Sequence, residues 1–380
     1  MNKDISNIAN LVKNKEGIDA TMGMLMDEDK NIIYAKAFKE EMFKLSDSAI
    51  FPYAGTTLSK NLEEGISNWL NLSHYSIPYE ISMTMGATGA LSQLFSLYQN
   101  VKRKQILIPN LSWSNYDNIA ETHGYDVFKY QLFNEKNTFD IKSFEKLLRK
   151  LVVKKGITII ILNFPAHNPT GYTLTKEELA MITKIINAYH SKHHPLKIAF
   201  DITYNEYDDM NINLTSLKRG VDKYFIYSFS KSMGLYGLRI GMLIYYSYYK
   251  NNLFKFVEKT KKLSRTTWGS SNNGVLNALG MVLTDNEKVI EMKENIKKNI
   301  CLLNKRANLF LENIDEKDLY PYNRGFYITI KTKNATKMLE YLFNNNVYAV
   351  EVDDGVRFSI ARLSEKEIKQ VIKVLKRYLE

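Results

Sequence analysis

The chain has 380 residues, 45% of them hydrophobic, which suits roughly two or three domains with cores of their own. Its net charge is +11, but lysines alternate with glutamates along amphipathic stretches such as 365–380, which is typical of a solvated surface and argues against nucleic-acid binding. No run approaches the ~20 apolar residues of a membrane span, so we expect neither nucleic acid nor a membrane as a partner.

Cysteine usage and the start of the chain indicate the compartment. A single cysteine, Cys301, excludes an internal disulfide, and the first residues lack the apolar run of a signal peptide. We therefore expect a cytoplasmic protein. Apolar neighbours on both sides of Cys301 place it on a buried helix face in this interpretation.

Short apolar segments alternate with helical segments between residues 46 and 285, which predicts a mostly parallel sheet flanked by helices. The expected strands are 80–85, 105–109, 157–162, 196–200, 224–227 and 239–246. From residue 286 a long charged helix (286–313) leads into an α+β pattern with strands at 325–330, 347–352 and 356–360, a helix at 335–343 and a final helix. The pattern predicts a large domain of residues 46–285 and a small domain of residues 1–45 and 286–380.

Small residues open the helix that follows the first of these strands, in Gly86-Ala87-Thr88-Gly89. Backbone N–H groups can approach a phosphate at such a helix start, and the helix dipole favours the anion. An aromatic residue, Trp113, follows the next strand, although a tryptophan is usually a core or interface residue.

Polar residues end the two central strands. The segment Asn163 to Gly171 reads N-F-P-A-H-N-P-T-G, and its prolines and glycine predict a sharp turn. Asp201 ends the next strand, three residues before Tyr204. Open α/β sheets bind ligands at the carboxyl ends of their strands, so Asp201 is expected to face a ligand, with a helix N-cap as the alternative.

The most specific motif surrounds Lys231, in S-F-S-K-S-M-G-L-Y-G-L-R-I-G from Ser228 to Gly241. A lysine at a strand end, with hydroxyls and Arg239 close by, suits a Schiff base to a phosphorylated aldehyde. The amine attacks the carbonyl, and the arginine fork with a hydroxyl holds the phosphate. A surface Lys-Ser turn is the alternative.

This pattern, S-x-S-K-x(5)-G-x-R-x-G, resembles the cofactor-lysine signature of the class I and II aminotransferases that depend on pyridoxal 5'-phosphate (PLP), nearest to the aspartate and aromatic group. The resemblance runs from about Gly23 to the C-terminus. It implies the α/β architecture called fold type I, with a mostly parallel seven-stranded sheet flanked by helices, a smaller α+β domain, and the cofactor between the domains at a dimer interface.

The resemblance also implies roles for the positions that match its motifs. Lys231 would carry the cofactor, Asp201 would pair with the ring nitrogen, and these two with Tyr204 would be the catalytic residues. The other implied contacts are Asn168 and Tyr204 at the phenolic oxygen, Trp113 on the ring, Ala87, Thr88, Ser228 and Arg239 at the phosphate, and Tyr53 at the phosphate of the neighbouring subunit.

Two arginines are implied to bind the substrate. Arg357, in G-V-R-F-S-I-A, would grip the α-carboxylate, with Gly23 and Asn168 beside it. Arg265 would bind a distal carboxylate from the neighbouring subunit, or is plain surface charge. Two departures leave the amino donor open. Tyr116 replaces a histidine of the dicarboxylate enzymes, and 268–273 replaces their Tyr-Ser-Asn-Pro-Pro.

The implied function is transfer of an amino group from an L-amino acid, of aspartate or aromatic type, to a 2-oxo acid such as 2-oxoglutarate, by a homodimer with shared active sites. A β-lyase or decarboxylase using the same lysine is the alternative, because a fold does not fix the reaction. A PLP-binding regulator is a second alternative, for which a DNA-binding module is expected ahead of the cofactor domain. No metal is expected. His190, His193 and His194 lack carboxylate or cysteine partners and are interpreted as a solvated helix end.

Overall fold

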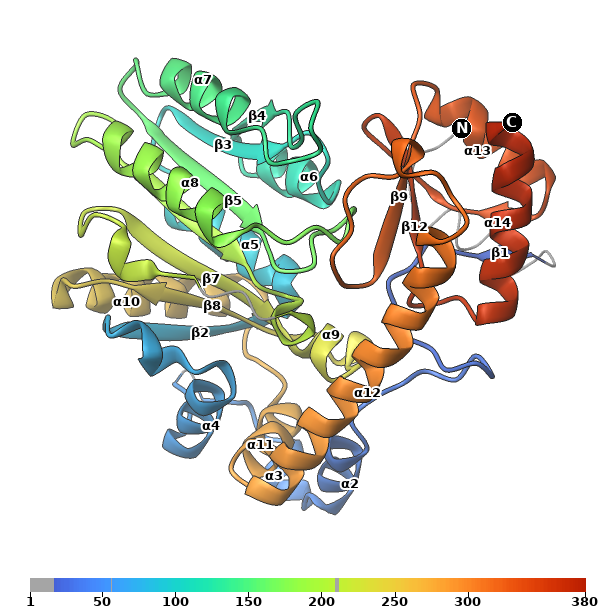
Figure 1. Ribbon diagram of the computed structural model, residues 1–380. Coiled ribbons are helices and arrows are strands. Elements are labelled where there is room, and N and C mark those ends of the chain that lie inside the picture. Colours follow the sequence, from blue (N-terminus) through green and yellow to red (C-terminus); the bar gives the residue numbers. More distant parts are fainter. Residues whose placement is uncertain (1–16, 56, 209–211) are drawn as a thin grey trace.

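The computed structural model describes residues 17–55, 57–208 and 212–380. Figure 1 shows two units, a large sheet covered by helices and a smaller unit that carries the C-terminus. The long helix α12, Asn286–Leu311, runs from beside α2 and α11 to the smaller unit, in agreement with the predicted change of pattern at residue 286 (Figure 1).

Seven strands form the large sheet in the order β2-β8-β7-β6-β5-β3-β4, and β8 runs in the opposite direction to the other six. Six of them match the predicted strands. The seventh, β4, was not predicted because it lies at the sheet edge and has no continuous apolar run. The strands are β2 Tyr79–Met85, β3 Lys104–Pro109, β4 Asp126–Tyr130, β5 Ile157–Asn163, β6 Leu196–Asp201, β7 Asp222–Ser228 and β8 Ile240–Tyr246.

Helices cover both faces of this sheet, which explains why its central strands read as unbroken apolar runs. Ile159 and Ile161 of β5 share a core with α5, α6 and α10, whereas Ile160 and Leu162 share a core with the opposite layer of α4, α7 and α8. The helices are α4 Lys60–Leu70, α5 Gly86–Leu97, α6 Asn115–Thr122, α7 Ile141–Leu151, α8 Lys176–Tyr189 and α10 Lys250–Thr267.

The smaller unit has a core of its own around an antiparallel sheet, β11-β12-β9. The N-terminal segment joins it, because β1 pairs in parallel with β10. Its elements are β1 Ile18–Asp19, β9 Tyr327–Lys331, α13 Ala335–Asn344, β10 Val347–Tyr348, β11 Val350–Val352, β12 Gly355–Ser359 and α14 Glu365–Leu379.

A group of short helices lies below the large sheet, at the start of α12 (Figure 1). It contains α2 Lys36–Lys44, α3 Asp47–Ile50 and α11 Asn273–Leu283. Phe38 of α2 is buried in the same core as the large sheet. The domain boundaries expected from the sequence stay a prediction. Phe38 bears on them, because it belongs to the segment assigned to the small domain but packs in the core of the large sheet.

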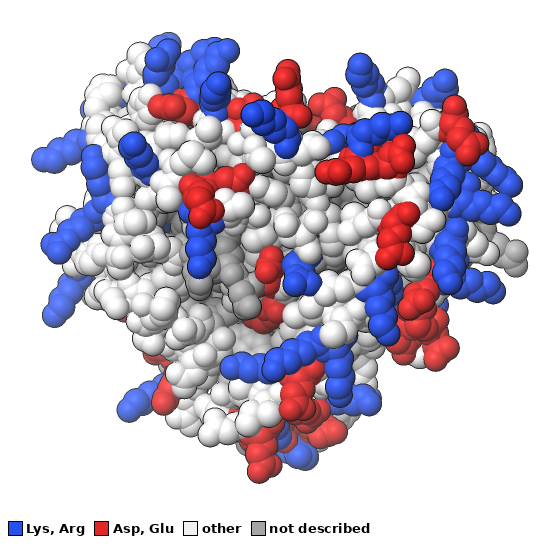
Figure 2. Space-filling model, in the orientation of Figure 1, with Lys and Arg blue, Asp and Glu red and all other residues white. Residues whose placement is uncertain are grey.

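One sequence expectation about α12 is wrong. Cys301 is exposed, because Leu303, Ala307 and Phe310 form the buried face of the helix and Cys301 lies off that face. Lysine and arginine side chains are interspersed with acidic ones over the face drawn in Figure 2. Within the described ranges, no helix combines the length and the hydrophobicity needed to cross a membrane.

Candidate active site

The carboxyl ends of three neighbouring parallel strands meet at one edge of the sheet. There β5 ends at Asn163, β6 at Asp201 and β7 at Ser228, and the one-turn helix α9, Phe229–Ser232, carries Lys231. A cavity of about 190 Å³ opens at this edge. It is lined by most of the residues expected from the sequence to contact a cofactor, which are Ala87, Thr88, Trp113, Asn168, Asp201, Tyr204, Ser228, Lys231 and Arg239.

The Lys231 amine lies in a partly buried, largely aromatic setting. Its Nζ donates to the Gly23 carbonyl at 2.5 Å and lies 5.1 Å from the ring centre of Tyr236. Burial lowers the pKa of Lys231, and although Tyr327 opposes this shift, the charges of Arg357 and Arg239 add to it. A larger fraction of the amine is therefore uncharged and nucleophilic than for an exposed lysine.

Asp201 is a buried carboxylate held by neutral donors. Tyr116 Oη donates to its Oδ2 at 2.5 Å, and Thr203 Oγ1 donates to its Oδ1 at 2.6 Å. Burial raises the pKa of Asp201, and the hydrogen bonds from Thr203 and Tyr116 partly offset that effect. No ion pair among the described residues involves Asp201. A cationic group of a ligand in the cavity would therefore be its natural charge partner.

The other end of the cavity suits an anion. The helix α5 begins at Gly86, whose φ is +68°, and a Cβ there would lie 2.6 Å from Arg239 Nη2, so the guanidinium lies against the helix start. Ala87 and Thr88 follow in the first turn, where backbone N–H groups have no partner within the helix. Ser228 adds a hydroxyl at the end of β7. These groups together match the requirements of a phosphate.

Arg357, on β12 of the smaller unit, contacts residues that line the cavity. Its Nη2 donates to the Thr21 carbonyl at 2.6 Å, and its Nη1 donates to Asn168 Oδ1 at 3.1 Å. The guanidinium also lies 4.4 Å from the ring centre of Tyr327. Its buried Nε has no hydrogen-bond partner in the part of the chain that the structure describes. These contacts fix the guanidinium of Arg357 beside the cavity.

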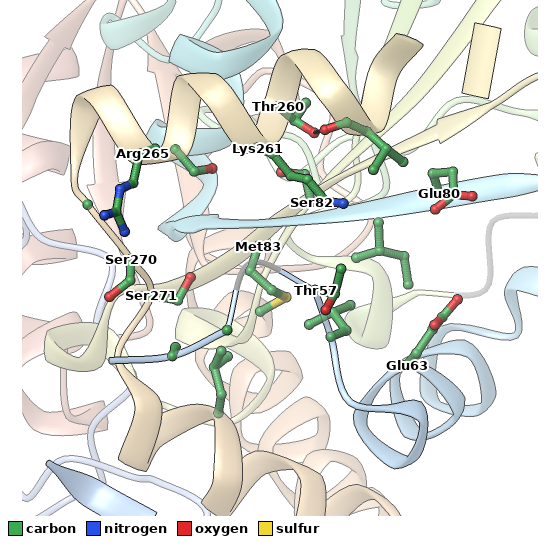
Figure 3. Close-up of a pocket in the computed structure, with 18 residues that line it drawn as sticks. Thr57, Glu63, Glu80, Ser82, Met83, Thr260, Lys261, Arg265, Ser270 and Ser271 are labelled. Atoms are coloured by element: carbon green, nitrogen blue, oxygen red, sulfur yellow. Dashed lines mark hydrogen bonds between the residues drawn. The ribbon is translucent and has the colours of Figure 1, made fainter. Parts of the chain in front are cut away.

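Four expected residues do not line this cavity. Gly23 and Arg357 contact residues that line it, whereas Tyr53 and Arg265 lie apart from it within one copy of the chain. Tyr53 is 90% exposed. Arg265 lies in a second pocket on the last turn of α10, together with Lys261, Ser270 and Ser271 (Figure 3). Ala54 and Gly55, which follow Tyr53, line the same second pocket.

The structure adds residues that sequence reasoning did not assign to the site. Asn163 and Thr203 lie at or beside strand ends, so the strand-end argument applied to Asp201 could have found them. Tyr236 lies within the Lys231 motif. Tyr327 begins β9 in the smaller unit and has no local signal, since the chain folds it into the cavity from far away in sequence.

The histidine cluster differs in part from its interpretation as a solvated helix end. His194 is buried, its Nδ1 lies 2.7 Å from the Lys154 carbonyl, and its Nε2 lies 2.8 Å from Thr158 Oγ1. These partners make His194 a packing residue of the sheet. Across the described ranges, no group of three or more His, Cys, Asp or Glu residues has a metal-binding arrangement.

Comparisons with known proteins identify the family. The model of aminotransferase class I and II matches residues 22–375. The mitochondrial aspartate aminotransferase of Saccharomyces cerevisiae is 25% identical over 94% of this chain and 87% of its own length. The chain belongs to the class I and II aminotransferases.

Solved structures share the fold. An aminotransferase from Anaerococcus prevotii matches with a TM-score of 0.89 at 22% identity, covering 99% of this chain and 95% of its own. An aromatic-amino-acid aminotransferase from Burkholderia pseudomallei, covalently bound to PLP, matches with a TM-score of 0.79 at 17% identity, covering 99% and 96%. The predicted fold type I architecture is confirmed. The chain is an enzyme of this family, a transaminase whose cofactor is PLP.

Proposed function

We propose that the enzyme moves the amino group of an L-amino acid of aspartate or aromatic type to a 2-oxo acid such as 2-oxoglutarate. One observation carries the proposal. A partly buried amine, Lys231, and a buried carboxylate without a cation, Asp201, line one cavity, and the guanidinium of Arg357 contacts residues that line it. These are the groups needed to bind an amino acid by its carboxylate and to move its α-proton.

The cavity fits PLP at both of its ends. The carboxylate of Asp201 would pair with the ring nitrogen, and Lys231 would hold the aldehyde carbon. Bound there, the cofactor supplies an electron-accepting ring that stabilises negative charge on the substrate α-carbon. The remaining cofactor contacts in this proposal are Trp113 on the ring, Asn168 and Tyr204 at the phenolic oxygen, and Ala87, Thr88, Ser228 and Arg239 at the phosphate.

The protein's own groups would divide the remaining work. Lys231 Nζ takes the α-proton and returns it, which its buried setting favours because the amine is readily uncharged. Arg357 holds the α-carboxylate, with Gly23 and Asn168 beside it. Its hydrogen bonds to Thr21 and Asn168 fix the fork before a substrate arrives, so little conformational entropy is lost on binding.

A homodimer with shared sites is part of the proposal. Arg265 and Tyr53 are both on the surface of one copy, away from the Lys231 cavity, which suits residues that serve a neighbouring copy. Arg265 would bind the distal carboxylate of a dicarboxylic substrate, and Tyr53 the cofactor phosphate. We also propose a cytoplasmic location, which cell fractionation would test.

Stopped-flow absorbance of the loaded enzyme against a panel of amino acids tests the activity. The proposal expects a cofactor spectrum that changes with aspartate, glutamate or aromatic donors and recovers when 2-oxoglutarate is added. Release of pyruvate and ammonia, or of carbon dioxide, from a single substrate without a 2-oxo acid would instead identify a β-lyase or a decarboxylase.

A further inference from the structure

Tyr327 is a phenol that lines the Lys231 cavity and has no role in the proposed function. It is 3% exposed and lines the same cavity as Lys231 and Asp201. Tyr204 Oη donates a hydrogen bond to Tyr327 Oη at 3.3 Å. The position of Tyr327 at the start of β9 brings a hydroxyl from the smaller unit to the reacting end of the site.

The hydroxyl of Tyr327 is a neighbour of the Lys231 amine. Gly23 lies between the two, and a Cβ at Gly23 would be 1.8 Å from Tyr327 Oη and 3.1 Å from Lys231 Nζ. Glycine is therefore needed at position 23 to leave room for this pair. The same absence of a side chain lets the Gly23 carbonyl accept the hydrogen bond from Lys231.

Charged groups face Tyr327 from several elements. Lys231 approaches from α9, and the Arg357 guanidinium from β12 lies over its ring. The phenols of Tyr204 and Tyr236 complete its titratable surroundings. Burial raises the pKa of Tyr327, but the charges of Lys231 and Arg357, with the hydrogen bond from Tyr204, outweigh burial and hold that pKa below its ordinary value.

We propose that Tyr327 is a further catalytic residue, which exchanges a proton with the free amine of Lys231. The O–H bond of Tyr327 breaks as an N–H bond forms on Lys231, which gives a phenolate and an ammonium, and the reverse transfer restores the neutral pair. One proton is thereby shared between two buried groups. This role rests on the proposed function, in which Lys231 Nζ moves the α-proton.

The test follows tyrosinate absorbance near 295 nm during a pH titration of the full chain freed of cofactor, with circular dichroism to confirm folding. The wild type should gain one tyrosinate below the ordinary tyrosine pKa of about 10, and Tyr327→Phe should lack it. Tyr130→Phe is the matched control and should keep it. Tyr130 is equally buried, but its hydroxyl has no hydrogen-bond partner in the described part of the chain and lies outside the cavity.

Two further measurements sharpen the test. Lys231→Gln should move the early tyrosinate transition to higher pH, which keeps the proposal testable if Tyr327→Phe does not fold. Competitive acetylation of Lys231 should begin at lower pH in Tyr327→Phe, because the amine loses the phenolate that stabilises its proton. In the loaded enzyme, kcat of Tyr327→Phe should fall about tenfold, less than the ~10²–10⁴ of a principal acid–base group, with little change in KM.

An early tyrosinate that persists in Tyr327→Phe would overturn the proposal, as would an acetylation profile of Lys231 that does not move. Neither readout needs turnover. A chain that fails to transaminate could still show the shared proton, so failure of the proposed function and failure of this inference are distinguishable.

Discussion

The Lys231 cavity and the Arg265 pocket differ in how completely one copy of the chain builds them. In the cavity, Asp201 and Arg357 are buried and tied to partners by several hydrogen bonds. In the second pocket, the side chain of Arg265, labelled in Figure 3, is exposed and has no hydrogen bond or ion pair to the described residues. The first site is organised before any ligand arrives, and the second offers groups without fixed positions.

The difference teaches which substitutions should matter most. A preorganised buried group acts in a low dielectric and has no substitute, so its loss is costly. An exposed arginine gains a defined role only from what covers it.

Lys231→Ala should remove activity by about 10⁴-fold or more, because the variant loses both its covalent attachment point and its proton carrier. Borohydride reduction of the yellow loaded enzyme, followed by peptide mapping, should place the cofactor on Lys231. Lys223 is an internal control. Burial lowers its pKa to about 8, but it lies at the opposite end of β7 and should stay unlabelled. A label at any other lysine would refute the assignment.

Asp201→Ala should slow α-proton removal by roughly 10²–10³-fold, because the cofactor ring loses the carboxylate that keeps its nitrogen protonated. Single-turnover kinetics with a deuterated α-carbon would measure this step. Asp201→Glu should retain more activity, since it keeps the charge. Near-normal turnover of Asp201→Ala would contradict the role.

Arg357→Ala should weaken every amino acid and every 2-oxo acid by about 10- to 150-fold, because all of them carry an α-carboxylate and a charge-assisted hydrogen bond contributes about 1.5–3 kcal/mol. The kcat/KM of Arg357→Lys should lie between those of the wild type and Arg357→Ala, since lysine keeps the charge but lacks the forked guanidinium. Values of kcat/KM across the substrate panel provide the measurement. A loss confined to dicarboxylic substrates would contradict this role, because it would show that Arg357 binds the distal carboxylate and not the α-carboxylate.

Arg265→Ala should weaken aspartate, glutamate and 2-oxoglutarate by a similar factor, about 10- to 150-fold, and spare aromatic donors. Lys262→Ala, an exposed neighbour on α10, is the matched control and should change neither. Unchanged kcat/KM for 2-oxoglutarate in Arg265→Ala would reduce Arg265 to surface charge.

Mixing inactive Lys231→Ala with Arg265→Ala extends that prediction to the dimer. Each hybrid dimer would hold one intact site if Arg265 serves the neighbouring copy, so dicarboxylate activity should partly return. Hybrid dimers that form without any rescue would place Arg265 at its own subunit's site or at none. The proposed difference, in which one copy builds the Lys231 cavity and a neighbouring copy uses Arg265, would then be wrong.

The smallest expected effect concerns Glu206, which is linked to the Lys231 turn through Tyr227, whose Oη lies 2.8 Å from Ser232 Oγ. Its carboxylate accepts hydrogen bonds from Trp69 Nε1 at 2.9 Å and Tyr227 Oη at 2.5 Å, and burial raises its pKa from 4.5 to about 7. The folded state therefore holds this proton more tightly than the unfolded state does, and between pH 4.5 and 7 the free energy of unfolding should fall as pH rises. Urea unfolding at several pH values should show that the free energy of unfolding falls less steeply with pH in Glu206→Gln than in the wild type. Equal slopes in the two proteins would contradict this role of Glu206.

Much of the fold and the cofactor end of the site could be predicted from the sequence. Apolar runs such as 157–162 predict buried strands because both faces of the sheet are covered. Asp201 and Lys231 lie directly at strand ends, so local position was enough to bring them to one edge. The edge strand β4 was not predicted, because it buries few side chains and therefore has no continuous apolar run.

The contacts between residues of the two units could not be predicted without the tertiary structure. Arg357 and Tyr327 come from strands of the smaller unit, and Gly23 from the N-terminal segment. Yet Gly23 accepts a hydrogen bond from Lys231, Tyr327 lines the same cavity as Lys231, and Arg357 lies over the Tyr327 ring. Neither periodicity nor spacing in the sequence predicts these contacts, because they depend on how two separately packed cores dock along α12. Local sequence was enough to place the polar groups at the strand ends of the large sheet. Docking of the smaller unit decided which groups face them, because contacts between residues far apart in sequence form only when both cores are packed.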